Sequence, residues 1–154
     1  MLAAGTNETP EILRALIEAG ADVNEKCKRG NTALMYAARQ NDNPEILHAL
    51  LQAGANIHEK NDYGKTSLMM AAGFNKNPLT LLVLINAGAN IYEKDNRGFT
   101  PMMEAAIWNE NPEILSYFLN SGSDVNETNI FGDTSMLWAA NFNKNPEIIR
   151  ITTC

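Results

Sequence analysis

Residues 27–60 read CKRGNTALMYAARQNDNPEILHALLQAGANIHEK, and residues 61–94 read NDYGKTSLMMAAGFNKNPLTLLVLINAGANIYEK. The two stretches carry two glycines, an Ala-Ala pair and a proline at matching places, and residues 95–128 repeat the pattern. One proline recurs at a constant step of 34 residues, at Pro10, Pro44, Pro78, Pro112 and Pro146. Because several features keep this one step along the chain, the sequence predicts an array of structural repeats.

The first half of each repeat has the pattern of a capped helix. In residues 27–60, Gly30 indicates a tight turn, and Thr32 can cap a helix that continues through Gln40. The Ala-Ala pair in this helix would let a neighbouring helix approach closely. Asn41 follows, and we expect it to close the helix in the left-handed conformation. The same asparagine recurs at Asn7, Asn75, Asn109 and Asn143.

The second half of each repeat predicts another helix. Asn43 before Pro44 is typical of an N-cap followed by a proline at the first helical position, where the missing N–H costs nothing. Gly54 and its equivalent Gly88 are expected to end these helices with positive φ. The apolar residues between form one stripe, made in this repeat by Ile46, Leu47, Leu50 and Leu51.

A repeat of this size cannot bury its apolar stripe alone, so the repeats must stack against one another. Each repeat is expected to hold a turn, a helix, a short loop, a second helix and an extended loop. The predicted fold is therefore an all-α solenoid of antiparallel helix pairs, with no sheet beyond short hairpins in the loops. We call the loops that precede the first helices finger loops: residues 27–31, 61–65, 95–99 and 129–133.

These motifs resemble ankyrin repeats. The family signature G-x-T-P-L-H-x-A-A is matched by residues 30–38 and 98–106, and the family's G-A-D-V-N by residues 20–24. The resemblance covers essentially the whole chain. It implies a single domain over residues 1–154, with partial repeats at 1–26 and 129–154 and full repeats at 27–60, 61–94 and 95–128.

Three features depart from the family pattern. The step of 34 residues exceeds the usual length of about 33, because the connection between the two helices has one extra residue. The histidine of the signature is absent, so the finger loops are expected to be held differently. The chain also begins and ends inside a repeat, and Thr152 and Thr153 replace an apolar pair. This end is interpreted either as a degenerate cap or as the edge of a longer array.

Composition argues against several functions. The net charge of −6 disfavours binding to nucleic acids or to anionic membranes. The longest strongly apolar run, Leu81 to Ile85, is far too short to span a bilayer, and the N-terminus lacks the pattern of a signal peptide. With only 2 cysteines, far apart, a disulfide framework is not expected. The sequence therefore predicts a cytoplasmic protein.

No set of residues suggests catalysis. His48 occupies a position that Leu82 and Ser116 fill in other repeats, and His58 lies in an extended loop, so both are interpreted as surface or loop residues. Cys27 near His58 suggests a metal only weakly, because no pair of ligands has zinc spacing. We predict that the chain is not an enzyme and has no catalytic residue, cofactor or metal site.

Two recurrent sets are interpreted as scaffold. One is an acidic row, Glu25, Glu59, Glu93 and Glu127, which faces Lys26, Lys60 and Lys94. Successive glutamates of the row would lie roughly 10 Å apart, which is too far for two of them to share a proton. The other is a set of methionines expected to fill the core, among them Met35, Met69, Met102, Met103 and Met136.

The positions that vary between repeats are the candidates for binding. The resemblance implies that the partner touches the finger-loop tips and the ends of the first helices, on the concave side. Aromatic residues near arginine at these positions have the composition of binding hot spots. We expect Tyr63, Phe99 and Phe131 to form one exposed row across successive finger tips, beside Lys65 and Arg97. The predicted contacts are Arg29, Tyr63, Lys65, Phe74, Arg97, Phe99, Trp108, Phe131 and Phe142.

Alternatives remain at the helix ends and on the outer face. Phe74, Trp108 and Phe142 could instead fold over the lengthened loop between helices and fill space. Leu79 and Leu82 make the second helix of residues 61–94 apolar nearly all round, which suggests either an outer contact or deeper packing.

The leading functional hypothesis is a protein–protein interaction scaffold that binds its partner in the concave groove. A partner segment that is apolar with acidic flanks would suit the predicted surface. One alternative is a regulatory or substrate-recruiting segment of a larger enzyme. Another is self-association through uncapped ends of the stack.

Overall fold

The computed structural model describes residues 10–152. These residues fold into helices joined by loops, and the pairing that the sequence predicts is present. The helices are α2 (Pro10–Glu18), α3 (Ala33–Gln40), α4 (Pro44–Gln52), α5 (Ser67–Phe74), α6 (Pro78–Asn86), α7 (Pro101–Trp108), α8 (Pro112–Asn120), α9 (Ser135–Phe142) and α10 (Pro146–Thr152).

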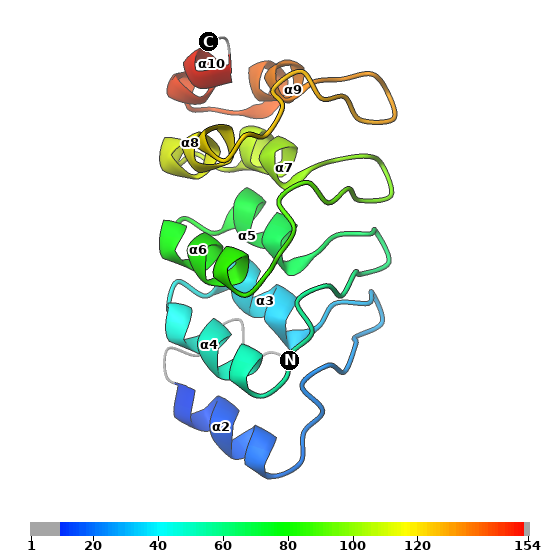
Figure 1. The fold of residues 1–154 in the computed structure, drawn as a ribbon, viewed down its shortest axis with the longest axis vertical. Helices are drawn as coiled ribbons and strands as arrows, with labels where there is room; N and C mark the ends of the chain where they lie inside the picture. The colour runs from blue at the N-terminus through cyan, green and yellow to red at the C-terminus, as the bar shows by residue number, and fades with distance from the viewer. Residues whose placement is uncertain (1–9, 153–154) are drawn as a thin grey trace.

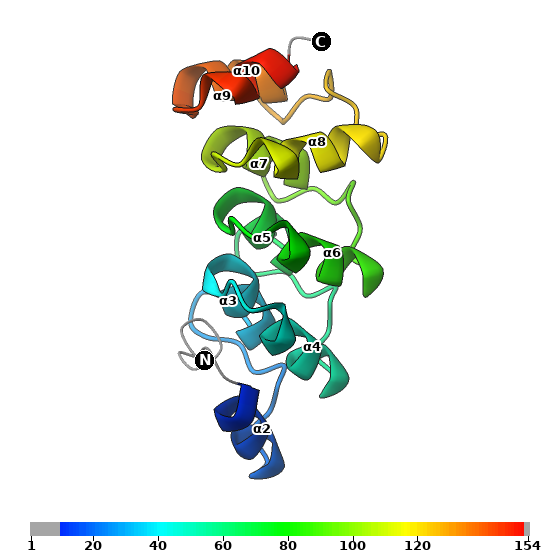
Figure 2. The same ribbon diagram turned by 90° about the vertical axis from the view of Figure 1, so that its left-hand side faces the viewer.

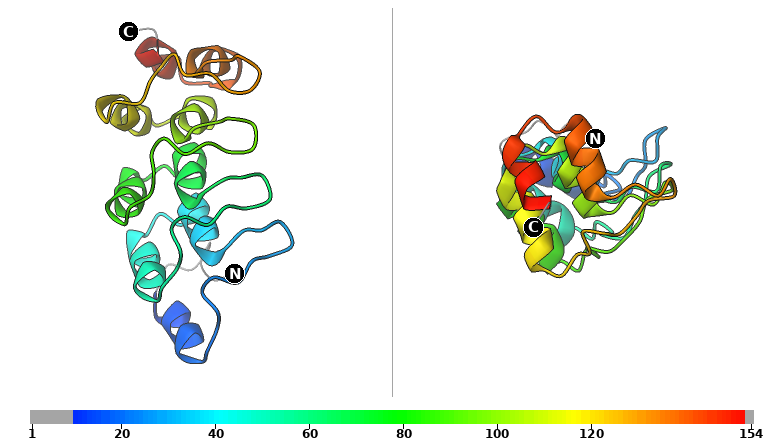
Figure 3. Two further views of the ribbon diagram at one scale, coloured as in Figure 1. Left: turned by 45° about the vertical axis from the view of Figure 1, so that its right-hand side comes forward. Right: turned by 90° about the horizontal axis from the view of Figure 1, so that it is seen from above.

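The helix pairs stack one above another into an elongated solenoid (Figure 1). The second helices of the pairs, from α2 to α10, form one column, and the first helices, from α3 to α9, form a parallel column beside it (Figure 2). The finger loops project from the side of the first helices and lie above one another (Figure 3). An isolated β-bridge joins Thr128 and Thr134 at the base of the last finger loop. None of the helices in residues 10–152 is long and apolar enough to cross a membrane.

The helix starts follow the predicted capping pattern. The hydroxyl of Thr32 accepts a hydrogen bond from the backbone N–H of Met35, and Asn43 caps the next helix by accepting from Glu45 N–H ahead of the proline at the first turn. Gly54 and Gly88, which follow the second helices, have φ of 90° and 96°, which confirms the predicted left-handed ends.

The asparagines after the first helices behave differently from the prediction. Asn41 has φ −102°, and no residue other than glycine in residues 10–152 has positive φ, so the expected left-handed closure is wrong. In later repeats the side-chain amide donates to two carbonyls of the preceding repeat: Asn75 bonds Ala38 and Asn41, each at 3.0 Å. Asn109 and Asn143 repeat the arrangement, whereas Asn7 lies outside the described residues. These asparagines tie each repeat to the one before it.

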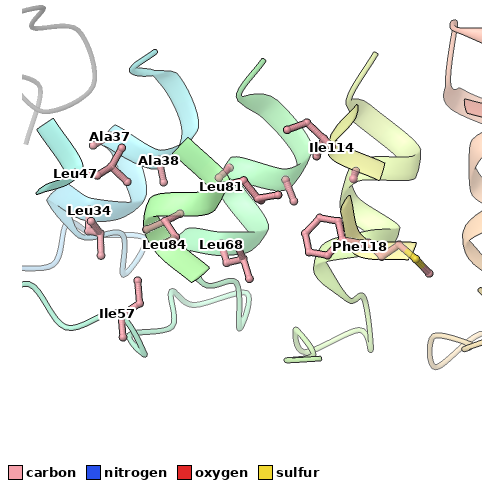
Figure 4. Packing of buried hydrophobic residues seen from close by; sticks show 14 of the residues in the cluster. Leu34, Ala37, Ala38, Leu47, Ile57, Leu68, Leu81, Leu84, Ile114 and Phe118 are labelled. Atoms are coloured by element: carbon pink, nitrogen blue, oxygen red, sulfur yellow. The ribbon is translucent and has the colours of Figure 1, made fainter. Parts of the chain in front are cut away.

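The core lies between the two helix columns and continues from repeat to repeat. Leu34, Leu68, Leu81 and Leu84 are among its buried side chains (Figure 4). The alanine pairs of α3, α5 and α7 are also buried, and α5 packs between α3 and α7. The small alanines therefore allow the close stacking that the sequence predicts. The predicted methionines are buried as well, except Met136, which is exposed on α9.

The finger loops are held by asparagine, aspartate and each other's backbone. Asn61 Oδ1 accepts from the backbone N–H groups of Tyr63 and Lys65, and Asp95 does the same one repeat later. Successive loops are linked by backbone hydrogen bonds, such as Asn96 N–H to the carbonyl of Tyr63 at 3.0 Å. These bonds hold the loops in register without the signature histidine.

The predicted row of glutamates does face lysines. Lys26 pairs with Glu59 at 2.5 Å, and the same pairing recurs as Lys60–Glu93 and Lys94–Glu127. Hydrogen bonds from these lysines lower the pKa of Glu59 and Glu93. Each pair joins consecutive repeats on the exposed loops, so the row is part of the scaffold.

Candidate functional site

A groove of about 340 Å³ lies between the finger loops and the first helices. Its walls come from consecutive repeats, because the stacked loops and helices present equivalent positions side by side. The lining combines aromatic rings with charged side chains. Seven of the nine predicted contact residues line the groove: Arg29, Tyr63, Lys65, Phe74, Arg97, Phe99 and Trp108. The other two flank it through ring contacts, Phe131 with Arg97, and Phe142 with Trp108 and Trp138.

Two of the three predicted finger-loop aromatics are exposed. Tyr63 and Phe131 leave 57% and 60% of their surface accessible, so both can contact a partner. Phe99 is only 4% exposed, so the prediction that it lies at an exposed finger tip is wrong. Its ring packs against Trp138, with ring centroids 5.2 Å apart, and joins a small core with Met103 and Ile107.

The register of the repeats explains the difference. One step of 34 residues after Tyr63 is Arg97, and the next is Phe131, whereas Phe99 is equivalent to Lys65. The expected aromatic row is therefore interrupted by an arginine. The Arg97 guanidinium lies 5.1 Å from the Phe99 ring centroid and 5.5 Å from that of Phe131, so it bridges a buried ring and an exposed one.

The aromatics at the ends of the first helices form a ladder along the groove. Phe74 stacks on Trp108 with centroids 6.2 Å apart, and Trp108 lies 6.3 Å from Phe142. Arg39 from the preceding repeat covers Phe74 at 4.6 Å. Trp108 and Phe142 keep about half of their surface exposed, so neither ring is a buried space-filling residue. The rings therefore contact one another and still leave part of their surface accessible to a partner.

An ion pair that the sequence analysis did not identify lies in the groove. Lys65 Nζ is 2.6 Å from Oε1 of Glu104, whose side chain is only 3% exposed. Burial raises the pKa of the Glu104 carboxyl, the positive charges of Lys65 and Arg97 oppose that rise, and Asp95 adds to it. The Oε2 atom of Glu104 is buried without a hydrogen-bond partner among the described residues.

The repeat pattern could have revealed Glu104. The positions equivalent to it hold Tyr36, Met70 and Trp138, so a carboxylate stands where other repeats have large, mostly apolar side chains. A charged residue among apolar equivalents is a signal of a special environment, because charged side chains are rarely buried unless they are paired. Trp138 belongs to the same series and was missed for the same reason.

The groove is more positive than the rest of the chain. Its lining contains four cations, Arg29, Arg39, Lys65 and Arg97, and two carboxylates, Asp95 and Glu104. The whole chain carries a net charge of −6. Cationic side chains are therefore concentrated where the exposed aromatic rings are, and the groove has the charge to attract acidic groups.

The outer face offers less. Leu79 on α6 is 54% exposed, whereas Leu82 is half-buried and contributes to a shallow depression between α6 and α8. The deeper packing considered for this helix holds for Leu81 and Leu84, which are buried. One exposed leucine is ordinary for a protein surface, so the outer face is the weaker candidate.

Comparison with known proteins identifies the fold family. A family model described as ankyrin repeats (3 copies) matches residues 1–95, 34–129 and 68–151. No curated protein matches the chain. Ankyrin repeats are generally protein–protein interaction modules. Because the matched segments together cover nearly the whole chain, this protein belongs to the ankyrin-repeat family.

Proposed function

We propose that this chain binds a partner protein in the groove between its finger loops and first helices. The observation that carries the proposal is the coincidence of half-exposed aromatic rings with four cations in the lining of one groove. Tryptophan, tyrosine and arginine are enriched among the few residues that carry most of the binding energy in protein interfaces. The same combination is absent from the lining of the depression between α6 and α8.

The groove suits an extended partner segment with apolar side chains and acidic flanks. Tyr63 and Phe131 offer ring surface at the finger loops, and Trp108 offers it at the helix ends. Arg39 and Arg97 lie over neighbouring rings, and this stacking leaves the N–H donors at the edge of a guanidinium able to bind carboxylates. The rings would supply buried area, and the cations would orient the segment.

The test compares a groove variant with an outer-face variant. Tyr63→Ala, Trp108→Ala and Phe131→Ala are combined in one chain, and Leu79→Ala with Leu82→Ala forms the control. Phe99 is left intact because its ring is buried. Both variants and the parent chain are used to isolate proteins from the native cell, and the recovered proteins are identified by mass spectrometry.

The groove variant should lose the partner, since each central anchor contributes about 2 kcal/mol or more to binding. Its melting temperature should change little because the removed rings are largely exposed. The outer-face control should retain the partner. Retention by the groove variant together with loss by the outer-face variant would move the binding surface to α6.

We also propose weak self-association through the outer side of α9. Met136 and Leu137 are 38% and 47% exposed there, although the equivalent Met102 and Met103 of α7 are buried against the next repeat. A second copy could cover these side chains, giving a heterologous contact. Leu137→Lys should reduce the apparent mass measured by light scattering at high concentration. A monomer at every concentration before the change would contradict the proposal.

A further inference from the structure

One pair of positions in the groove changes its chemistry from repeat to repeat. Lys65 and Glu104 form an ion pair, while the equivalent residues one repeat later, Phe99 and Trp138, form an aromatic pair with centroids 5.2 Å apart. The equivalent residues one repeat earlier are Asn31 and Met70, which are also buried in the groove wall. The stack therefore forms with polar, charged or aromatic residues at this pair.

The ion pair has no evident structural purpose. Burying two charges has a desolvation cost that their attraction often fails to recover, and neutral pairs of similar size are commonly as stable. Glu104 is almost completely buried, and its Oε2 atom has no partner in the described residues. Two other interfaces achieve the same stacking with uncharged side chains, so another role is needed to explain the pair.

Lys65 is placed to meet a ligand. Its side chain is 24% exposed, lines the groove and donates from Nζ to Glu104 Oε1 alone among the described residues. Lys65 brings a positive charge to the same groove as Arg29, Arg39 and Arg97. Of the two carboxylates present, Asp95 already accepts the backbone N–H groups of Arg97 and Phe99. Glu104 is thus the one lining carboxylate that holds the Lys65 ammonium.

We propose that Lys65 is the binding site for a carboxylate side chain of the partner, and that Glu104 holds the ammonium in place until the partner arrives. This inference rests on the proposed function of the groove and assigns the chemistry of one contact in it. The partner would place an aspartate or glutamate side chain at Lys65, beside an apolar residue seated on Tyr63 or Trp108.

Binding at this site is coupled to a proton. A second carboxylate at Lys65 weakens the ion pair and adds a negative charge near Glu104. Both changes favour the protonated form of Glu104, so binding should be accompanied by proton uptake. The charged groups that face Glu104 are Lys65 and Arg97, which oppose its protonation, and Asp95, which favours it. The neighbouring helices α5 and α9 contribute Met70 and Trp138 to the groove, and neither of these side chains titrates. The affinity should therefore rise as pH falls, until the partner's own carboxylate is protonated.

The probe is a phage-displayed library of random linear peptides selected on the purified chain. The strongest peptide is then synthesised with its acidic residues intact and with each replaced by its amide. Three chains are compared: the parent, Glu104→Gln, and Lys65→Asn with Glu104→Met, which installs the Asn31–Met70 pair found in the preceding repeat. Thermal melting by circular dichroism establishes that each chain is folded.

Peptides selected on the parent chain should be rich in acidic residues next to aromatic or aliphatic ones. Replacing one acidic residue by its amide should weaken binding to the parent at least about tenfold and should have little effect on the Lys65→Asn, Glu104→Met chain. Glu104→Gln should bind the acidic peptide several-fold more tightly, because Lys65 is no longer neutralised. Calorimetry in buffers of different ionisation enthalpy should detect proton uptake in the parent and not in Glu104→Gln.

Selected peptides that are neutral or basic would overturn the inference, as would an amide peptide that binds the parent chain as tightly as the acidic one. A separate control distinguishes failure of this contact from failure of the groove. If Tyr63→Ala with Phe131→Ala abolishes binding of neutral peptides, the groove function stands and only the carboxylate site is wrong. If no selected peptide depends on these rings, the proposed function fails as well.

Discussion

The face that α7 presents to α5 and the face that it presents to α9 use the same backbone and different chemistry. At both interfaces an asparagine amide donates to two carbonyls of the preceding repeat, from Asn109 in one and Asn143 in the other. The finger loops are linked by backbone hydrogen bonds of 3.0 and 3.2 Å, made by Asn96 and Ile130. The scaffold interactions are therefore nearly identical.

The side chains between those scaffold contacts differ. The α5–α7 interface holds the Lys65–Glu104 ion pair, and the α7–α9 interface holds the Phe99–Trp138 ring pair. Because the backbone contacts are the same with either pair, the stability of the stack does not dictate which residues occupy the two positions of the pair. The comparison teaches that the repeated geometry of the stack leaves the groove wall free to vary, and we propose that the variation at this pair serves partner binding.

The largest expected effect comes from removing only one member of the ion pair. Lys65→Met leaves the Glu104 carboxyl buried without its cation and should lower the free energy of unfolding by about 3 kcal/mol near neutral pH. Burial raises the pKa of Glu104, so the folded state keeps the proton to higher pH than the unfolded state does. Once Glu104 is protonated it is neutral, and the loss of the lysine costs less. The loss should therefore shrink as pH falls, when measured by urea denaturation.

The control for this change is the double substitution Lys65→Asn with Glu104→Met, which removes both charges. Its free energy of unfolding should stay within about 1 kcal/mol of the parent. A double variant as unstable as Lys65→Met would show that the ion pair is required by the scaffold, and the two interfaces would then not be interchangeable.

A substitution at a position that all repeats share should lower the stability by the same amount in each repeat. Gly88→Val should lower the free energy of unfolding by more than about 1 kcal/mol, because a β-branched residue adopts the φ of 96° at a cost. Gly54→Val is the matched control, since an added Cβ meets nothing within 4 Å at either glycine. Equal losses in thermal denaturation are expected, and an unchanged melting curve for Gly88→Val would contradict the capping role.

The smallest effect on stability is expected from Thr80 on α6. Its side chain is fully buried, its hydroxyl has no partner among the described residues, and the equivalent positions hold Ile46, Ile114 and Ile148. Thr80→Val removes an unsatisfied polar group at nearly constant volume and should stabilise the chain by about 1 kcal/mol. Thr80→Ser keeps the hydroxyl, loses a methyl group and should destabilise it. Loss of stability in Thr80→Val would mean that the hydroxyl is satisfied.

Much of the fold could be predicted because its determinants are local or strictly periodic. The threonine caps, the Asn-Pro helix starts and the glycines after the second helices follow from rules that act within a few residues. The prediction that an asparagine closes the first helix in the left-handed conformation was wrong because the side chain of Asn75 bonds carbonyls of the preceding repeat. Rules that act within a few residues do not include such partners. The finger loops likewise depend on bonds between repeats.

The groove was harder to predict than the fold. Tyr63 and Phe131 follow the step of 34 residues, but the burial of Phe99 depends on Trp138, which lies 39 residues away and belongs to a different set of positions. Lys65 and Glu104 have the same separation. Contacts across an interface combine two sets of positions, so a comparison of equivalent residues alone does not reveal them.

The two tryptophans of the chain, Trp108 and Trp138, both line the groove, and they allow its role to be tested by one measurement. The indole N–H resonances are recorded by NMR as the native partner or the selected peptide is added, with the methyl resonances of Leu79 on the outer face as reference. Binding in the groove predicts that both indole resonances shift or broaden with saturation while those of Leu79 stay in place. Saturating binding that moves the Leu79 methyl resonances and leaves both indoles unchanged would contradict the account.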